Sequence, residues 1–98
     1  MRTEKKLQNK ILNYARRKKM FAHKIESMSA NGMPDIIIIQ KLKTPILVNY
    51  KINFFELKKS STARKSVEQM KIVDELKNLG VDCSFEYNFD AIIKKLSF

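Results

Sequence analysis

Four consecutive isoleucines, Ile36 to Ile39, limit most strongly what this chain can fold into. The run is β-branched throughout and too short for a typical helix, so it favours a strand covered on both faces. Pro34 and Asp35 stand directly in front of it. A carboxylate beside a buried strand is unfavourable unless it is paired or bound to a cation. The sequence therefore predicts a central strand that begins at an acid with a special role.

Periodic patterns of apolar residues predict the elements around this strand. Helical spacing is found in three segments: 4–20, 67–79 (ended by Gly80) and 88–96 (capped by Asn88). Strand patterns are found in three further segments: 21–27, 44–58 and 81–87. A turn is expected at Asn31-Gly32 and a polar loop over 60–65. The order α-β-β-β-α-β-α predicts a central sheet flanked by helices, an α/β or α+β domain.

The length of the chain predicts one domain, residues 1–98, near the lower size limit for burying a core unaided. Cys83 is the single cysteine, which excludes a disulfide framework and a cysteine-based zinc site. The chain lacks the run of roughly 18 to 20 apolar residues that a membrane span requires, and it lacks the apolar segment of a secretory signal. We expect a cytoplasmic protein.

Basic residues outnumber acidic ones, twenty against ten, and the excess is uneven along the chain. Residues 1–24 carry nine Lys or Arg and one Glu, and residues 58–71 carry five against one, whereas residues 72–98 have a net charge of −2. A polyanion is the natural partner of such a field, because neutralised phosphates release condensed counterions. A solvated lysine-rich surface or an anionic membrane would also suit this composition, but nucleic acid is the favoured partner.

A second acid, Glu56, interrupts an apolar strand segment, and Lys58 follows two positions later. Alternation along a strand places Glu56 and Lys58 on one face, roughly 7 Å apart, with Leu57 on the other face. If Asp35 lies on the adjacent strand, the two carboxylates can hold one divalent ion. Such hard oxygen ligands suit Mg²⁺ or Mn²⁺, which lowers the pKa of a bound water and stabilises charge on a phosphate. Lys58 would orient the nucleophile or offset developing charge.

The Glu-x-Lys pattern alone is weakly specific, because the chain contains three copies. The copies that begin at Glu4 and Glu75 fall on predicted helices, where positions two apart do not share a face. Only the copy at Glu56 combines a strand with an upstream Pro-Asp and an apolar run. The alternative interpretation of this copy is an ordinary ion pair on an edge strand.

Four motifs in this order resemble the VRR-NUC branch of the PD-(D/E)xK nucleases. They are Asn31-Gly32-Met33-Pro34-Asp35, Phe55-Glu56-Leu57-Lys58, Ser66-Val67-Glu68-Gln69 and Leu79-Gly80. Glu4, followed by Leu7-Gln8, is similar to the acid that this family carries on its first helix. The similarity spans residues 4–96, and the four motifs together are far more specific than any one. The segment 41–53 departs from the family pattern, since it is longer than the usual tight connection, and we interpret it as an extended hairpin.

The resemblance implies a restriction-endonuclease-like α/β core with a mixed sheet, and a Mg²⁺- or Mn²⁺-dependent endonuclease that hydrolyses DNA phosphodiester bonds. It further implies four metal-holding groups: Asp35, Glu56, the Leu57 backbone carbonyl and Glu4, the last directly or through water. By the same resemblance Lys58 assists the nucleophile and Gln69 supports the site. Free-standing members of about this length resemble homodimeric phage and bacterial enzymes that resolve branched DNA, such as four-way (Holliday) junctions. A bacterial or phage-infected cell is therefore implied.

Several of these residues have structural alternatives. Ser66-x-x-Gln69 is a capping-box pattern, so Gln69 can bond the Ser66 backbone at a helix start. Glu4 can be a first-turn acid that interacts favourably with the helix dipole. His23, the single histidine, has no partner in the sequence for a general-base role. Cys83 is in phase with core residues of its strand.

Seven basic residues are expected to contact phosphates: Arg16, Arg17, Lys18, Lys19, Lys59, Arg64 and Lys65. The first four are equally well explained as a solvated helix end. Two functions follow from the sequence, a nuclease or a non-catalytic basic module that binds nucleic acid. Asp35 and Glu56 within reach of one metal favour the nuclease, whereas a Glu56 side chain pointing to solvent favours the binding module.

Overall fold

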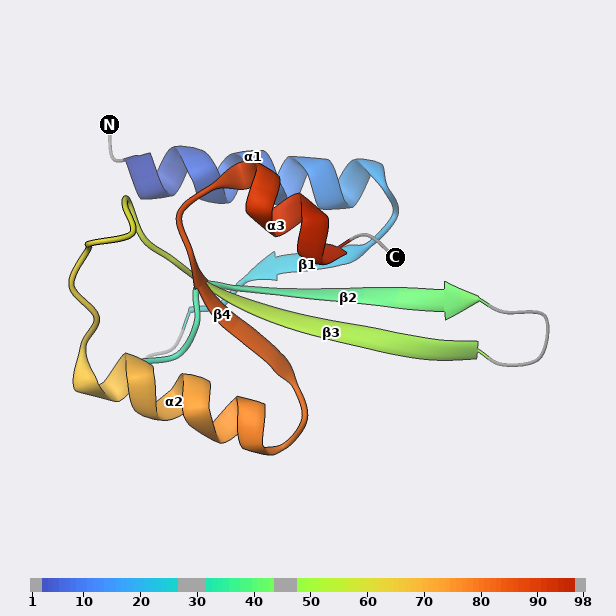
Figure 1. Cartoon of the computed structure of the whole chain (residues 1–98). Helices are drawn as coiled ribbons and strands as arrows, with labels where there is room; N and C mark the ends of the chain where they lie inside the picture. The colour runs from blue at the N-terminus through green and yellow to red at the C-terminus, as the bar shows by residue number, and fades with distance from the viewer. Residues whose placement is uncertain (1–2, 27–31, 44–47, 97–98) are drawn as a thin grey trace.

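The computed structural model describes residues 3–26, 32–43 and 48–96, and these contain three helices and four strands. In chain order they are α1 (Thr3–Arg17), β1 (Phe21–Lys24), β2 (Ile36–Lys43), β3 (Val48–Leu57), α2 (Val67–Asn78), β4 (Asp82–Glu86) and α3 (Phe89–Leu96). The predicted order α-β-β-β-α-β-α is confirmed. Figure 1 shows α1 and α3 on one face of the sheet and α2 on the other.

The four strands form one mixed sheet in the order β1-β2-β3-β4. β1 pairs antiparallel with β2, and β2 pairs antiparallel with β3. β4 instead pairs parallel with β3, and α2 supplies the crossover connection that a parallel pair requires. The end of β3 is therefore flanked by the start of β2 and followed by the loop that leads into α2.

The main hydrophobic core lies between the sheet and the pair α1 and α3. Ile36, Ile38 and Phe55 are fully buried there, together with Ile11 of α1 and Ile92 of α3. Burying such a side chain contributes about 1.5–3 kcal/mol. This core fixes the position of β2 and β3, the two strands that carry the predicted acids.

The other face of the sheet is only partly covered. Val73 is the buried residue of α2, while Ile37 and Ile39 are half-buried. The isoleucine run is thus covered completely on one face and partly on the other. Phe21, Ile39 and Ile52 lie opposite one another across β1, β2 and β3, and Phe21 and Ile52 remain 53% and 38% exposed. An apolar row of the sheet therefore has no covering helix.

Most element boundaries shift by a few residues from the predicted ones, and the backbone shows why. α1 ends at Arg17 and not at Met20, because Lys19 adopts a left-handed φ of 64° and the Met20 N–H donates to the Ala15 carbonyl. Such a left-handed residue is a common helix stop. α2 ends at Asn78, followed by Gly80 at φ 84°, in agreement with the predicted stop. β1 and β4 are shorter than predicted.

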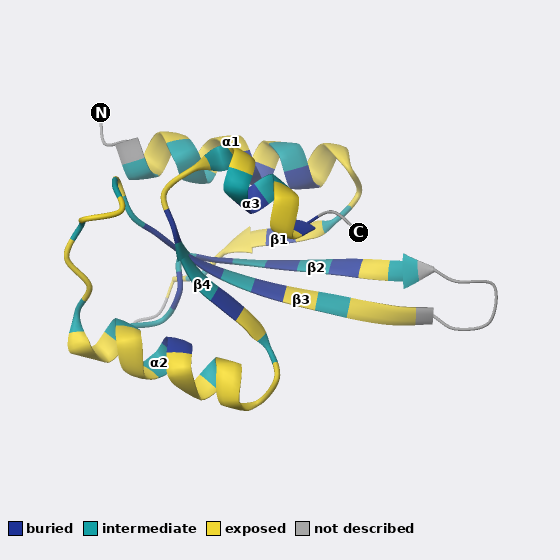
Figure 2. Ribbon diagram, in the orientation of Figure 1, coloured by how far each residue is buried: buried dark blue, intermediate teal, exposed yellow. Residues whose placement is uncertain are grey.

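The expected extended hairpin is present in β2 and β3, whose pairing runs from Ile36 and Phe55 out to Lys43 and Val48. Figure 2 shows that burial is concentrated where the strands meet the helices and that the far end of the hairpin is exposed. Residues 44–47, and Asn31 of the predicted turn, lie outside the described residues. Within the described part of the chain, every helix is too short or too polar to cross a bilayer.

Candidate active site

The two predicted acids meet at the end of β3. Because Ile36 pairs with Phe55, Asp35 lies beside the end of the neighbouring strand, and its N–H donates to the Phe55 carbonyl at 3.0 Å. The Asp35 carboxylate accepts a hydrogen bond from the Leu57 N–H at 2.7 Å through Oδ2. This main-chain contact orients the Asp35 side chain toward Glu56. The sheet register thus brings together residues 21 positions apart.

Glu56 is turned inward and is only 5% exposed. Its Oε2 accepts a hydrogen bond from Gln69 Nε2 at 2.9 Å. Its other oxygen, Oε1, is buried and receives no hydrogen bond from any described group. A buried carboxylate oxygen without a partner is costly. The geometry therefore leaves one strong acceptor, Glu56 Oε1, without a hydrogen-bond donor among the described groups.

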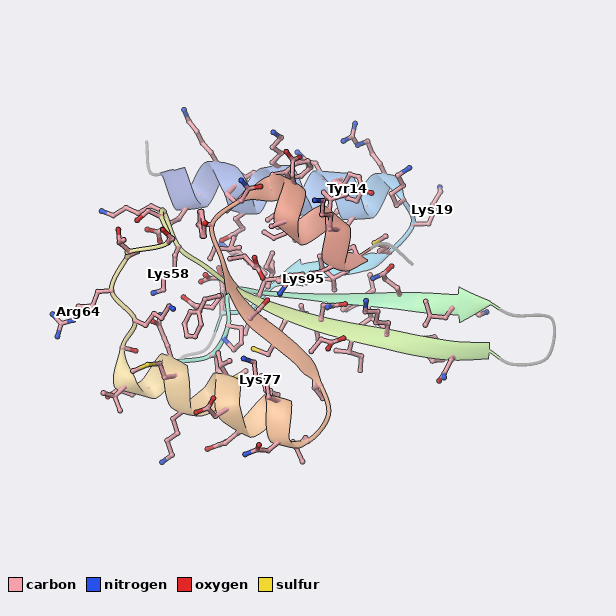
Figure 3. The ribbon with its side chains drawn as sticks, in the orientation of Figure 1. Tyr14, Lys19, Lys58, Arg64, Lys77 and Lys95 are labelled. Carbon is pink, nitrogen blue, oxygen red and sulfur yellow. The ribbon has the colours of Figure 1, made fainter. Side chains whose placement is uncertain are left out.

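Lys58 lies on the same side of the chain as Glu56, as the strand alternation predicted. Its Nζ is 3.7 Å from Glu56 Oε2 and donates to Gln69 Oε1 at 2.8 Å. The side chain of Lys58 is 13% exposed, so its ammonium is held and not freely solvated. Figure 3 shows Lys58 at the end of the sheet where α2 begins.

Gln69 is both a capping residue and a member of this site. Its Oε1 accepts from the Ser66 N–H at 3.0 Å, and its own N–H donates to Ser66 Oγ at 3.0 Å, which completes the capping box of α2. The same amide bonds Lys58 through Oε1 and Glu56 through Nε2. The predicted capping box is therefore confirmed, and the same side chain contacts both Glu56 and Lys58, while its role in a functional site stays a prediction.

The pKa values of Asp35 and Glu56 reflect the burial of the two carboxyls and their closeness to each other. Burial and, after it, the neighbouring Asp35 together raise the pKa of Glu56 from 4.5 to about 7, against the lowering effect of Lys58. Burial also raises the pKa of Asp35, against the lowering effect of the Leu57 N–H and of Lys58. Two neighbouring carboxyls that interact electrostatically resist simultaneous ionisation unless a cation lies between them. Both pKa values are thus raised, and perturbed pKa values in paired acids are often found at functional sites.

Glu4 lies in the first turn of α1, and its charge raises the pKa of both Asp35 and Glu56. It is therefore close enough to act on the pair. Among the residues that the structure describes, however, no three His, Cys, Asp or Glu side chains are grouped as a metal site. The role of Glu4 at a metal, directly or through water, stays a prediction.

The donor set fits a hard divalent cation. Asp35 and Glu56 offer adjacent carboxylate oxygens, and Glu56 Oε1 lacks any other partner among the described groups. Mg²⁺ is commonly held by one or two carboxylates and several waters, so two protein carboxylates suffice. The role of the Leu57 carbonyl as a further ligand stays a prediction.

Gly32 lies close to the site, although the sequence marked it only as part of a turn and of the motif that ends at Asp35. It adopts φ 87°, and a Cβ added there would lie 2.5 Å from the Glu68 carbonyl group and 2.8 Å from the Gln69 nitrogen. Only glycine allows the chain before Asp35 to lie against the first turn of α2. The turn signal and the motif pointed to this position, but neither indicated its contact with α2.

The predicted phosphate-binding residues fall into two groups at different ends of the molecule. Lys59, Arg64 and Lys65 lie between β3 and α2, next to the site, and Lys65 Nζ sits 4.9 Å from the centre of the Phe85 ring. Figure 3 shows Arg64 and Lys58 at the same end of the molecule and Lys19 at the opposite end of α1.

The second group, Arg16 to Lys19, lies away from the acids. Arg16 is twelve residues beyond Glu4, which is about 18 Å along a helix. Its guanidinium donates to the Ala22 carbonyl through Nε at 3.2 Å and Nη2 at 3.1 Å. Arg16 therefore joins α1 to β1, while Arg17, Lys18 and Lys19 are exposed.

The two remaining reactive residues have structural surroundings. His23 is exposed on β1 and packs against Phe21, with ring centres 4.6 Å apart. Cys83 is buried, as predicted, and burial raises the pKa of its thiol to about 11. Neither observation assigns these side chains to the site.

A solved structure described as a VRR_NUC domain has the same fold. Its TM-score to this chain is 0.77, and the match covers 98% of this chain and 96% of that one at 18% sequence identity. The likeness confirms the predicted restriction-endonuclease-like fold. The likeness in fold to a VRR_NUC domain, which the motifs first suggested, extends over 98% of this chain. No family model matches the sequence, and no curated protein gives a significant match.

Proposed function

We propose that this chain is a VRR-NUC-type nuclease of the PD-(D/E)xK class, a Mg²⁺- or Mn²⁺-dependent endonuclease that hydrolyses DNA. The observation that carries the proposal is the buried Glu56 carboxylate beside Asp35, with one oxygen unsatisfied and with Lys58 held by Gln69. Residues of these types in this arrangement suit phosphodiester hydrolysis. The fold shared with a VRR_NUC domain supports the same class.

Each side chain has a distinct task in this scheme. Asp35 and Glu56 would hold the cation, with the Leu57 N–H keeping the Asp35 carboxylate oriented. When bound, the cation supplies a water of lowered pKa and stabilises charge on the phosphate. Lys58 would orient the attacking water or offset charge that develops on the phosphate.

The remaining members of the site position these groups. Gln69 would fix both the Glu56 carboxylate and the Lys58 ammonium. Glu4 would hold a water of the metal shell. Because both contacts come from one amide, Gln69 would hold the Glu56 carboxylate and the Lys58 ammonium side by side.

Site-directed variants test this proposal directly. Asp35→Asn retains an oxygen that can accept the Leu57 N–H, and Lys58→Ala removes only the ammonium. Both variants should fold and bind DNA as the wild type does but lose at least about a hundredfold in metal-dependent cleavage. Lys71→Ala, an exposed lysine of α2, is the matched control and should cut normally. Cleavage by either site variant at the wild-type rate would overturn the assignment.

A non-catalytic module that binds nucleic acid is the second candidate function. It is supported by the charge of +10. The inward orientation of Glu56, at 5% exposure, favours the nuclease. A panel of single-stranded, duplex, flap and four-way DNA with Mg²⁺, Mn²⁺ or EDTA separates the two functions. Salt-sensitive binding without metal-dependent cleavage of any substrate would support the module.

We further propose branched DNA, such as four-way junctions, as the preferred substrate, a homodimer as the active form, and a cytoplasmic location. Symmetric cutting of two strands requires two sites, which a two-fold dimer supplies. The uncovered apolar row with Phe21 and Ile52 is the first surface to test. Light scattering should give the mass of two copies for the wild type and of one copy for Phe21→Ser with Ile52→Ser. A wild-type monomer that cuts junctions symmetrically would contradict the dimer.

A further inference from the structure

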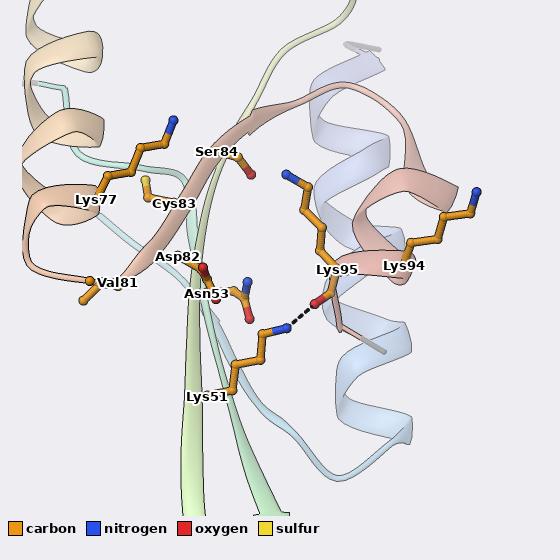
Figure 4. Close-up of a pocket in the computed structure, with 10 residues that line it drawn as sticks. Lys51, Asn53, Lys77, Val81, Asp82, Cys83, Ser84, Lys94 and Lys95 are labelled. Carbon is orange, nitrogen blue, oxygen red and sulfur yellow. Dashed lines mark hydrogen bonds between the residues drawn. The ribbon is translucent and has the colours of Figure 1, made fainter. Parts of the chain in front are cut away.

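A groove of about 520 Å³ runs along β4, and neither Asp35 nor Glu56 is among the residues that line it. Four lysines from three elements line it: Lys51 of β3, Lys77 of α2, and Lys94 and Lys95 of α3. Figure 4 shows Lys77 on one side of β4 and Lys94 and Lys95 on the other. No run of basic residues in the sequence announces this groove, because residues 72–98 have a net charge of −2.

The lysines of the groove are only partly neutralised. Lys95 pairs with Glu86 at 2.8 Å, and Lys51 donates to the Lys95 carbonyl at 2.7 Å. Lys77 and Lys94 form no ion pair or hydrogen bond with any described residue. Asp82, the acid in the lining, forms no ion pair with Lys77 or Lys94, all three being described residues. Like charges gathered around one groove repel one another unless an anion lies between them.

The floor of the groove contains a buried polar group that the fold leaves unsatisfied. Asn53 is 3% exposed and lines the groove, and its Oδ1 has no hydrogen-bond donor among the described groups. A buried amide of this kind requires a ligand or a bound water to complete its hydrogen bonds. The neighbouring Cys83 is a neutral thiol at physiological pH, since burial raises its pKa, so it adds no negative charge. The groove combines a polar floor with a positive rim.

We propose that this groove binds a backbone phosphate of the nucleic acid, outside the cutting site. The inference rests on the proposed function for the identity of the anion. Gln69 of the site and Lys77 of the groove lie eight residues apart on α2, about 12 Å along the helix. At a rise of about 3.4 Å per nucleotide, that separation corresponds to three or four nucleotides. One nucleic-acid strand can therefore reach both.

Binding measured without metal tests the groove separately from cleavage. The variant Lys77→Ala with Lys94→Ala removes the two ammonium groups that have no described partner. The control, Lys41→Ala with Lys71→Ala, removes the same charge from exposed lysines outside the groove. Fluorescence anisotropy with a labelled duplex oligonucleotide in EDTA, at several salt concentrations, gives the Kd and its salt slope. Since all four side chains are exposed, both variants should fold, which circular dichroism verifies.

The groove variant should weaken binding roughly tenfold and reduce the salt slope by about one phosphate, and the control should do less than half as much. Equal effects of the two variants would overturn the groove, because the loss would then reflect net charge alone. Inorganic phosphate that binds the wild type but not the groove variant, with unchanged oligonucleotide affinity, would also overturn it. If the wild type cuts no DNA while the groove variant still loses affinity, the groove stands and the nuclease proposal fails.

Discussion

At the residue scale, the oxygen and the nitrogen of the Gln69 side-chain amide both form hydrogen bonds. Nε2 donates to Glu56, while Oε1 accepts from Lys58 and from the Ser66 main chain. The amide thus connects the Glu56 carboxylate, the Lys58 ammonium and the start of α2. A residue that orients the groups holding a metal often affects activity tenfold to a hundredfold.

Replacing Gln69 should therefore separate catalysis from capping. Gln69→Met should lower the cleavage rate roughly tenfold to a hundredfold and destabilise the fold by about 1 kcal/mol. Ser66→Ala removes the side chain that accepts the Gln69 N–H and should cost about 1 kcal/mol while leaving cleavage nearly unchanged. Single-turnover cleavage and urea unfolding measure the two effects. Equal cleavage losses in both variants would show that Gln69 acts only through the helix start.

The raised pKa of Glu56 predicts how stability changes with pH. The native state binds the proton of the Glu56 carboxyl more tightly than the unfolded state does, because folding raises the pKa of this group from 4.5 to about 7. The resulting stabilisation is complete below pH 4.5 and is lost as pH rises through 7. In EDTA, the wild type should lose on the order of 2 kcal/mol over this range relative to Glu56→Gln. Urea unfolding at several pH values measures the difference, and parallel curves for the two proteins would contradict the raised pKa.

At the scale of elements, the contact between the loop before β2 and the start of α2 sets the position of Gln69. Gly32 lies against the first turn of α2, where an added Cβ would be 2.5 Å from the Glu68 carbonyl group. The clash would push α2 away from β3. Since Gln69 lies in that turn, its bonds to Glu56 and Lys58 would lengthen.

Two glycine variants isolate this packing effect. Gly32→Ala should destabilise the fold by about 1–3 kcal/mol and lower cleavage, because it adds a clash to the left-handed strain. Gly80→Ala has a similar φ of 84° but no atom within 4 Å of the added Cβ. It should cost about 1 kcal/mol and leave cleavage intact. Thermal unfolding and cleavage rates compare the two, and similar losses of cleavage would refute the role of the contact.

At the scale of the whole molecule, the basic residues predicted to contact phosphates lie in two separate places, the loop between β3 and α2 and the C-terminal end of α1. Arg64 and Lys65 lie next to the acids, whereas Lys18 and Lys19 lie at the far end of α1. DNA seated at the site is therefore closer to the first pair. The total charge lost is the same for either pair, so position alone should decide the effect.

Double variants of these pairs should differ in DNA affinity. Arg64→Ala with Lys65→Ala should weaken binding roughly tenfold, and Lys18→Ala with Lys19→Ala by less than about threefold. Anisotropy titrations in EDTA at a fixed salt concentration provide the comparison. A larger loss from the Lys18 and Lys19 pair would mean that DNA follows α1 instead of the loop before α2.

The sequence by itself determined the order of the helices and strands, and it singled out Asp35 and Glu56 as the two acids of the candidate site. Four isoleucines predicted the strand of Asp35, alternation placed Glu56 and Lys58 on one side, and Ser66 with Gln69 marked a helix start. Period, capping and turn chemistry act over a few residues, so they are legible in the sequence. The boundaries were less well predicted, because left-handed Lys19 and the sheet pairing decide where elements end.

Only the tertiary structure decided which distant residues meet. The pairing of β2 with β3 brought Asp35 to Glu56, the crossover through α2 brought Gln69 to both, and the same packing left Glu56 Oε1 unsatisfied. It also separated Arg16 from the acids and gathered Lys51, Lys77, Lys94 and Lys95 around one groove. The charge of a segment is a sum over neighbours in sequence, whereas an electrostatic field depends on distances in space. Those distances are set by register and packing, which no local pattern contains.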